Sequence, residues 1–206
     1  MALHVSDIDF EHREILLKNK PPAMLEASPK GTVPVLITTA GKVIDESAQI
    51  IFWCLEQHDP AQWLGENKSL VNDITALIER NDVLFKPCLD RYKYADRHPQ
   101  KSMEGHRKDS LFFLDELETR LVRQSCDQPF LLGNRCSAGD IVVLSFIRQF
   151  AFVDKTWFDN APYPYLQNWL SRLMATPLFE KTMEKIPLWE FEQPKQDLPT
   201  PSPNIS

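Results

Sequence analysis

The stretch PKGTVPVLITTAGKVIDES, residues 29–47, decides the fold of this chain. Its β-branched run, Val33 to Thr38, predicts a strand, and the AG pair that follows predicts a tight turn. Residues 42–45 then read as the returning strand of a hairpin. A helical pattern, SAQIIFWCLEQH, begins after Glu46 and ends before Pro60. The stretch therefore predicts a small sheet that leads directly into a helix.

The residues before this hairpin predict one more strand and one short helix. Residues 8–16, IDFEHREIL, alternate loosely between polar and apolar side chains and read as a strand. The Pro21-Pro22 pair then marks a loop, and a helix over 23–27 can start just inside it because proline is tolerated in the first helical turn. The expected order of the first 60 residues is strand, helix, strand, strand, helix.

The rest of the chain predicts helices. Apolar side chains recur at helical spacing over 69–94, with Pro87 expected to kink that helix because it lacks a backbone donor. Further helices are expected over 104–124, 141–147, 164–174 and 177–185. We therefore predict an α+β chain with a sheet-containing domain over 1–60, an all-helical domain over 61–190, and a disordered proline-rich tail over 191–206.

Composition excludes several classes of function. The formal net charge of −6 argues against a nucleic-acid or anionic-membrane partner, since both require a basic face. No run approaches the roughly 18 apolar residues of a membrane span. The four cysteines are far apart and form no CxxC pair, which is typical of free thiols in a reducing cytoplasm. The histidines show no metal-ligand spacing, so we expect no metal.

Two segments resemble the cytosolic glutathione S-transferases. Residues 29–47 resemble the glutathione-binding half of that family, and FLLGNRCSAGDIVVLSFI, residues 130–147, resembles the start of its central carboxy-terminal helix. The resemblance implies a thioredoxin-like domain followed by an all-helical domain. It also implies glutathione as co-substrate, a small electrophile or disulfide as second substrate, a cytoplasmic location and a possible homodimer.

The resemblance assigns glutathione-binding roles to residues of the 29–47 stretch. The Val33–Pro34 bond would be cis, so that the Val33 backbone pairs with the cysteinyl unit of glutathione. A trans proline at a strand edge is the alternative. Ser47 would hold the γ-glutamyl carboxylate at the start of a helix, and Glu46 would meet the amino group. Simple helix capping by Asp45 or Ser47 is the alternative there.

Lys20 is the residue that points to one subgroup. It precedes Val33 by 13 positions, and Val33 precedes Glu46 by 13. This spacing resembles the omega-like, cysteine-type transferases, in which such a lysine helps to hold the glycine end of glutathione. A solvated charge beside Lys18 is the alternative.

Two further groups lie in the helical region. Ser137 and Asp140 form a capping-box pattern, which we interpret as structural. Phe85, Cys88 and Tyr92 share one face of the 69–94 helix and are candidates for the electrophile pocket, although such a stripe is more often core.

The family pattern also predicts what this sequence lacks. Chains of the family begin with a strand and a loop that carries a Tyr, Ser or Cys, whereas Met1 aligns with the end of the first helix. We therefore expect the first strand and the catalytic residue to be missing from residues 1–206, and we assign no catalytic residue. The expected function is thiol transfer, reduction or conjugation of glutathione to electrophiles in the complete form. The alternatives are a non-catalytic partner protein similar to stringent starvation protein A, or an inactive truncated product.

Overall fold

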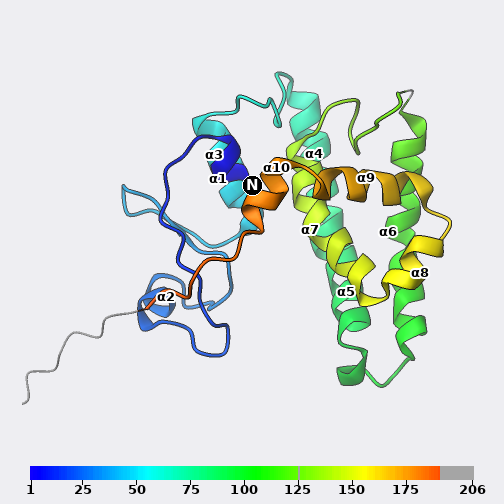
Figure 1. The fold of residues 1–206 in the computed structure, drawn as a ribbon, viewed down its shortest axis with the longest axis horizontal. Helices are drawn as coiled ribbons and strands as arrows, with labels where there is room; N and C mark the ends of the chain where they lie inside the picture. The colour runs from blue at the N-terminus through cyan, green and yellow to red at the C-terminus, as the bar shows by residue number, and fades with distance from the viewer. Residues whose placement is uncertain (125, 191–206) are drawn as a thin grey trace, which may run out of the picture.

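The computed structural model describes residues 1–124 and 126–190, so the expected disordered tail over 191–206 lies outside the described residues. Figure 1 shows a small part, with short helices and long connections, beside a part built from long helices. The small part contains α1 (Ala2–Val5), α2 (Pro22–Ala27), a hairpin and α3 (Ser47–Gln57). An α+β architecture was expected from the sequence, and this arrangement agrees with it.

The predicted hairpin is present but shorter than expected. β1 (Leu36–Ile37) pairs antiparallel with β2 (Val43–Ile44), with Leu36 opposite Ile44 and Ile37 opposite Val43. The turn depends on Gly41, whose φ of +79° lies in the left-handed region that glycine adopts without strain. Ile44 is buried, so one face of this hairpin packs on the interior.

The strand expected over 8–16 is not formed. In this segment only Glu14 pairs with a distant residue, in a parallel bridge to Leu188, and the Trp189 amide donates to the Glu14 carbonyl at 2.8 Å. The side chains over 11–14 are all exposed. A strand requires continuous pairing along its length, and a single bridge to a short segment does not supply it.

A short helix that the sequence did not predict follows the central helix. The side chain of Asp154 accepts a hydrogen bond from the Trp157 amide at 3.0 Å and thereby caps α8 (Lys155–Asn160). The sequence does contain the capping residue of this helix, Asp154, three positions before Trp157. At six residues, the segment is too short for helical periodicity to reveal it.

The helix expected over 69–94 is interrupted just before Pro87. It consists of α4 (Lys68–Arg80), a π-helical segment over Asn81–Phe85, and α5 (Lys86–Lys93). Proline cannot donate to the carbonyl one turn earlier and clashes with it. The wider π-helical turn accommodates this clash, so the expected disturbance at Pro87 takes the form of a π-helical segment.

The remaining helices enclose one large core. They are α6 (Met103–Arg123), α7 (Ala138–Val153), α9 (Pro164–Met174) and α10 (Pro177–Thr182), and a single 3₁₀ turn lies at Ala95–Arg97. The core gathers buried aromatic and aliphatic side chains from α5, α6, α7 and α9, among them Phe113, Leu117, Phe150, Leu166 and Trp169. None of the helices in the described ranges is long and apolar enough to cross a membrane.

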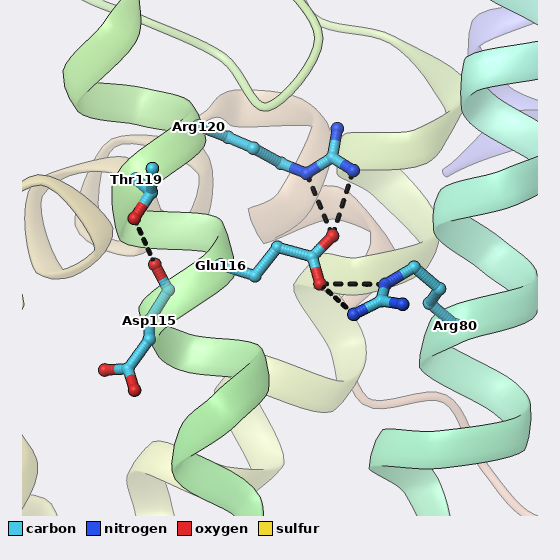
Figure 2. A network of polar contacts seen from close by, with 5 residues as sticks. All are labelled: Arg80, Asp115, Glu116, Thr119 and Arg120. Carbon is cyan, nitrogen blue, oxygen red and sulfur yellow. Dashed lines mark hydrogen bonds and ion pairs between the residues drawn. The ribbon is translucent and has the colours of Figure 1, made fainter.

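Charged side chains tie α4 to α6 at the surface. Figure 2 shows Glu116 of α6 between two arginines: one carboxylate oxygen accepts from Arg80 Nε at 2.8 Å and the other from Arg120 Nη2 at 2.9 Å. The Glu116 side chain is only 20% exposed, so this network is partly shielded from water.

A second apolar cluster joins the small part to the long helices. It contains Leu55 from α3, Ile74 and Ile78 from α4, and Ile141 and Val142 from α7. The contact positions α3, and with it the surface that carries the candidate site, against the helical part.

Candidate functional site

The segment from Lys20 to Gly31 folds back on itself. Pro22 is the first residue of α2, where proline is tolerated because that position has no intrahelical donor role. Gly31 has a φ of +64°, and its amide donates to the Ser28 carbonyl at 2.9 Å. A Cβ at Gly31 would lie 3.7 Å from the Lys20 ammonium nitrogen, so this turn brings Lys20 beside the loop that precedes Val33.

Val33 presents its backbone at the surface. The Val33–Pro34 peptide bond is cis, which confirms that prediction. Val33 is 48% exposed, and within the described residues neither its amide nor its carbonyl takes part in a hydrogen bond. Its main-chain polar groups are therefore available to a ligand.

The first turn of α3 is also open. Glu46 is the N-cap residue, but its side chain does not cap the helix, and Ser47 is exposed as the first helical residue. No side chain in the described part of the chain caps the amides of this turn, in contrast to the capping that the alternative interpretation of Asp45 or Ser47 required. Free amides at a helix start attract an anion, because the helix dipole is positive there.

A cluster of charged residues connects this helix start to the loop at 28–31. The Ser28 hydroxyl donates to Asp45 Oδ2 at 2.7 Å, and Lys30 forms ion pairs with both Asp45 and Glu46. The Ser28 hydrogen bond, followed by the Lys30 charge, lowers the pKa of the Asp45 carboxyl below its ordinary value. The hydrogen bond to Glu46 raises the pKa of Lys30. Glu46 is thus held in place by a cation from the same surface.

Sequence reasoning did not include Ser28 or Lys30 among the candidate residues. The signal that could have found them is the SPKG run at 28–31, where a serine and a lysine flank a proline and precede a glycine turn. The turn at Gly31 lies next to Ser28 and Lys30, whose side chains contact the acidic pair at 45–46.

The predicted electrophile-pocket residues Phe85 and Tyr92 do not line an open pocket. Their side chains are 0% and 1% exposed and belong to the main core. The Phe85 ring stacks on Phe113 with 4.7 Å between centroids, and Tyr92 lies 5.0 Å from the Phe150 ring. The pocket prediction is wrong for these two residues, because α6 and α7 cover the face that the periodicity had identified.

Cys88 differs from these two neighbours. It is half-buried, and its thiol accepts a hydrogen bond from Arg91 Nη2 at 3.2 Å, one turn further along α5. Cys88 lies on α5, whereas the exposed backbone of Val33 and the start of α3 belong to other parts of the chain. Its role in an electrophile pocket stays a prediction.

The capping box at α7 is confirmed and extends further than predicted. The Asp140 carboxylate accepts from the Ser137 amide at 2.9 Å and the Ser137 hydroxyl at 2.6 Å. It also accepts from the Leu131 amide and the Trp169 indole, both at 2.9 Å. Complete burial raises the pKa of Asp140, against the effect of these hydrogen bonds. Asp140 joins α7, α9 and the preceding loop, which is a structural role.

Comparison with known proteins gives one consistent result. Residues 1–63 match the family model described as "Glutathione S-transferase, N-terminal domain", and residues 100–172 match "Glutathione S-transferase, C-terminal domain". Glutathione S-transferase U19 of Arabidopsis thaliana is 25% identical over 208 residues, which cover 97% of this chain and 90% of that protein.

Solved structures agree in fold. BphK, a bacterial glutathione S-transferase solved as a ternary complex, superposes with a TM-score of 0.73 at 22% identity, over 87% of this chain and 88% of that one. A family member from Pseudomonas fluorescens, solved with two glutathione bound, gives a TM-score of 0.70 at 16% identity over 87% and 84% of the two chains. At these identities the matches establish the fold, and they confirm the predicted fold class.

Proposed function

Because the chain belongs to the glutathione S-transferase family, we propose that it binds glutathione on the surface formed by Lys20, Val33, Pro34, Glu46 and Ser47. Glutathione is then the co-substrate for thiol chemistry on a small electrophile or disulfide. The observation that carries this proposal is the open first turn of α3, which supplies uncapped amides and an exposed Ser47 hydroxyl on the same surface as the unpaired backbone of Val33.

The γ-glutamyl end of glutathione fits the start of α3. Its carboxylate would accept from the amides of the first turn and from the Ser47 hydroxyl, where the dipole of this 11-residue helix favours negative charge. Its ammonium would contact Glu46. Lys30 already pairs with one Glu46 oxygen, so the ligand ammonium would share this carboxylate with Lys30 or replace it.

The other two units of glutathione fit the preceding loop. The cysteinyl amide and carbonyl would pair with the backbone of Val33 in the manner of an added strand, since neither main-chain group there has a partner among the described residues. The glycine carboxylate would then face Lys20, which the Gly31 turn holds near this loop. An exposed lysine contact of this kind is weakened by salt.

The reaction is either conjugation of the glutathione thiol to an electrophile or thiol transfer with a disulfide. The family relationship supports both, together with assembly as a homodimer and a cytoplasmic location, which we propose for this chain as well. Turnover with an activated aryl chloride and with a glutathione mixed disulfide would separate the two reactions. Binding of glutathione without either turnover would instead support the non-catalytic binding protein.

Calorimetric titration of the full chain with glutathione tests the site. Ser47→Ala should weaken binding about tenfold, because it removes a hydrogen bond to a charged carboxylate. Lys20→Ala should weaken binding less, and the difference from the unmodified chain should shrink as salt is raised. Ser69→Ala is the matched control, since Ser69 is an exposed serine in the first turn of α4.

The order of the two effects decides the assignment. If Lys20→Ala weakens binding more than Ser47→Ala, or if the Ser69 control weakens it equally, the α3 start does not hold the carboxylate. If no binding is detected with the unmodified chain at millimolar glutathione, the proposed function fails as a whole.

A further inference from the structure

We infer that the surface proposed for glutathione also binds glutathione analogues without a free α-amino group, because Lys30 already supplies the cation that Glu46 would otherwise take from the ligand. This inference rests on the proposed function and names a further ligand class for the same surface. The Lys30 ammonium pairs with Glu46 Oε1 and lies 3.8 Å from Asp45 Oδ1. The protein thus carries a positive charge at the place assigned to the ligand ammonium.

Glu46 lies where it would meet the carboxylate of the γ-glutamyl end. It is the N-cap residue of α3, and the amides of the first turn that follow it are the proposed carboxylate site. Like charges this close repel each other. A ligand that brings a carboxylate without an ammonium is therefore rejected by an uncompensated Glu46, and it is accepted when a cation of the protein neutralises Glu46.

A turn at Gly31 fixes the position of Lys30. Gly31 has a φ of +64°, and its amide donates to the Ser28 carbonyl at 2.9 Å. The Ser28 hydroxyl donates to Asp45 Oδ2 at 2.7 Å, which leaves Oδ1 of the same carboxylate to Lys30. The lysine therefore has the carboxylates of two consecutive residues beside it. The hydrogen bond to Glu46 raises the pKa of Lys30, so its ammonium stays protonated at neutral pH.

Glu46 can hold Lys30 and a ligand ammonium at the same time. Lys30 contacts Oε1, whereas Oε2 forms no hydrogen bond or ion pair within residues 1–124 and 126–190. The Glu46 side chain is 52% exposed, so an ammonium has access to this second oxygen. Because an exposed ion pair of this kind contributes little free energy, the amino group should improve the affinity of a ligand by less than about fivefold.

A pair of ligands that differ only in the amino group tests the inference on the full chain. They are glutathione and its deaminated form, glutaryl-cysteinylglycine, which keeps both carboxylates and the thiol. Calorimetry at low ionic strength should give a preference for glutathione below about fivefold in the unmodified chain. In Lys30→Met, Glu46 is uncompensated, and this preference should rise by a further factor of about five or more, with a smaller rise at high salt.

Three further variants separate the charge at Glu46 from general effects. Lys42→Met makes the same change in net charge at an exposed position outside the site and should leave the preference unaltered. Lys30→Arg keeps a cation and should keep the preference low. In the double variant Lys30→Met, Glu46→Gln, the repulsion is removed and the preference should fall back below about fivefold. A merely structural role of Lys30 would lower the affinity for both ligands equally and leave the preference where it was.

Four results would overturn the inference while leaving the proposed function intact, because glutathione itself binds in each of them. They are a preference above about fivefold in the unmodified chain, an unaltered preference in Lys30→Met, an equal rise in the Lys42 control, and a raised preference that persists in the double variant. If neither ligand binds at millimolar concentration, the proposed function fails, and this inference fails with it.

Discussion

The surface proposed to bind glutathione and the core of the helical part hold their key residues in opposite ways. Ser47, Glu46 and Val33 are exposed, and they are positioned by a helix start, an ion pair and a short hairpin. Phe85 and Asp140, in contrast, are fully buried and are fixed by neighbours from several helices. The first turn of α3 has no side-chain cap among the described residues, whereas the Asp140 carboxylate accepts hydrogen bonds from several buried donors.

Because of this difference, substitutions in the two regions should affect different properties, ligand affinity in one and the free energy of unfolding in the other. A change on the exposed surface should alter ligand binding with little effect on folding, because few other groups depend on those side chains. A change in the core should lower the free energy of unfolding with little direct effect on the ligand surface. Four substitutions test this separation.

The largest effect should come from Phe85→Ala. Removal of a fully buried ring that stacks on Phe113 should lower the free energy of unfolding by about 3–5 kcal/mol. Urea denaturation measures this loss. Phe112→Ala, at an exposed position on the same helix as Phe113, should change stability by no more than about 0.5 kcal/mol. A stable Phe85→Ala variant with altered electrophile preference would restore the pocket prediction that the structure contradicts.

Asp140→Asn should have the next largest effect. The amide keeps one acceptor oxygen but turns a donor toward buried donors from Ser137 or Trp169. The loss should be about 1–3 kcal/mol in a chemical denaturation experiment. Glutathione affinity of the folded variant should stay unchanged, and a selective loss of affinity would contradict the separation of the two regions.

Glu116→Gln should have a smaller effect. It removes the charge that Arg80 and Arg120 share across α4 and α6, as Figure 2 shows. Because the pair is partly exposed, we expect a loss of about 0.5–1 kcal/mol that decreases with added salt. Glu79→Gln, an exposed position on α4, is the control. A loss that does not depend on salt would indicate that packing, not charge, holds this contact.

The smallest effect on stability should come from Ser28→Ala, and it should appear in the pH dependence. Ser28 is the main cause of the lowered pKa of Asp45, so its removal should raise that pKa toward the ordinary value. A lowered folded-state pKa contributes stability that is present above the unfolded pKa and is lost as pH falls through the folded pKa. The variant should lose this contribution at a higher pH. NMR titration of the Asp45 carboxyl measures the change, and an unaltered pKa would show that Ser28 is not its cause.

Local patterns made much of the fold predictable. The hairpin followed from the turn at Gly41, α7 followed from the Ser137–Asp140 box, and the long helices followed from apolar periodicity. The strand over 8–16 could not be judged this way, because a strand depends on pairing with a neighbour, and among the described residues the only distant bridge of this segment is from Glu14 to Leu188.

The backbone features around the candidate site were predictable in part. Glu46 and Ser47 lie at the start of α3, which the sequence marks, and the cis bond after Val33 was expected. The charge partners were not found, because Lys30 meets Glu46 only after the chain turns at Gly31. Periodicity identified the face that carries Phe85 but not the helices that cover it.

The hydrogen bond from Trp189 to Glu14 has a consequence for synthesis on the ribosome. Glu14 leaves the exit tunnel early, whereas its partner is among the last residues of the described range to be translated. The Glu14 carbonyl therefore cannot form this hydrogen bond until every helix from α2 to α10 has been made. Such a contact closes a loop of nearly the whole described chain, which is entropically the least favourable kind to form early. The small part of this protein, although it precedes the long helices in the chain, therefore acquires this backbone contact only after residue 189 has been made.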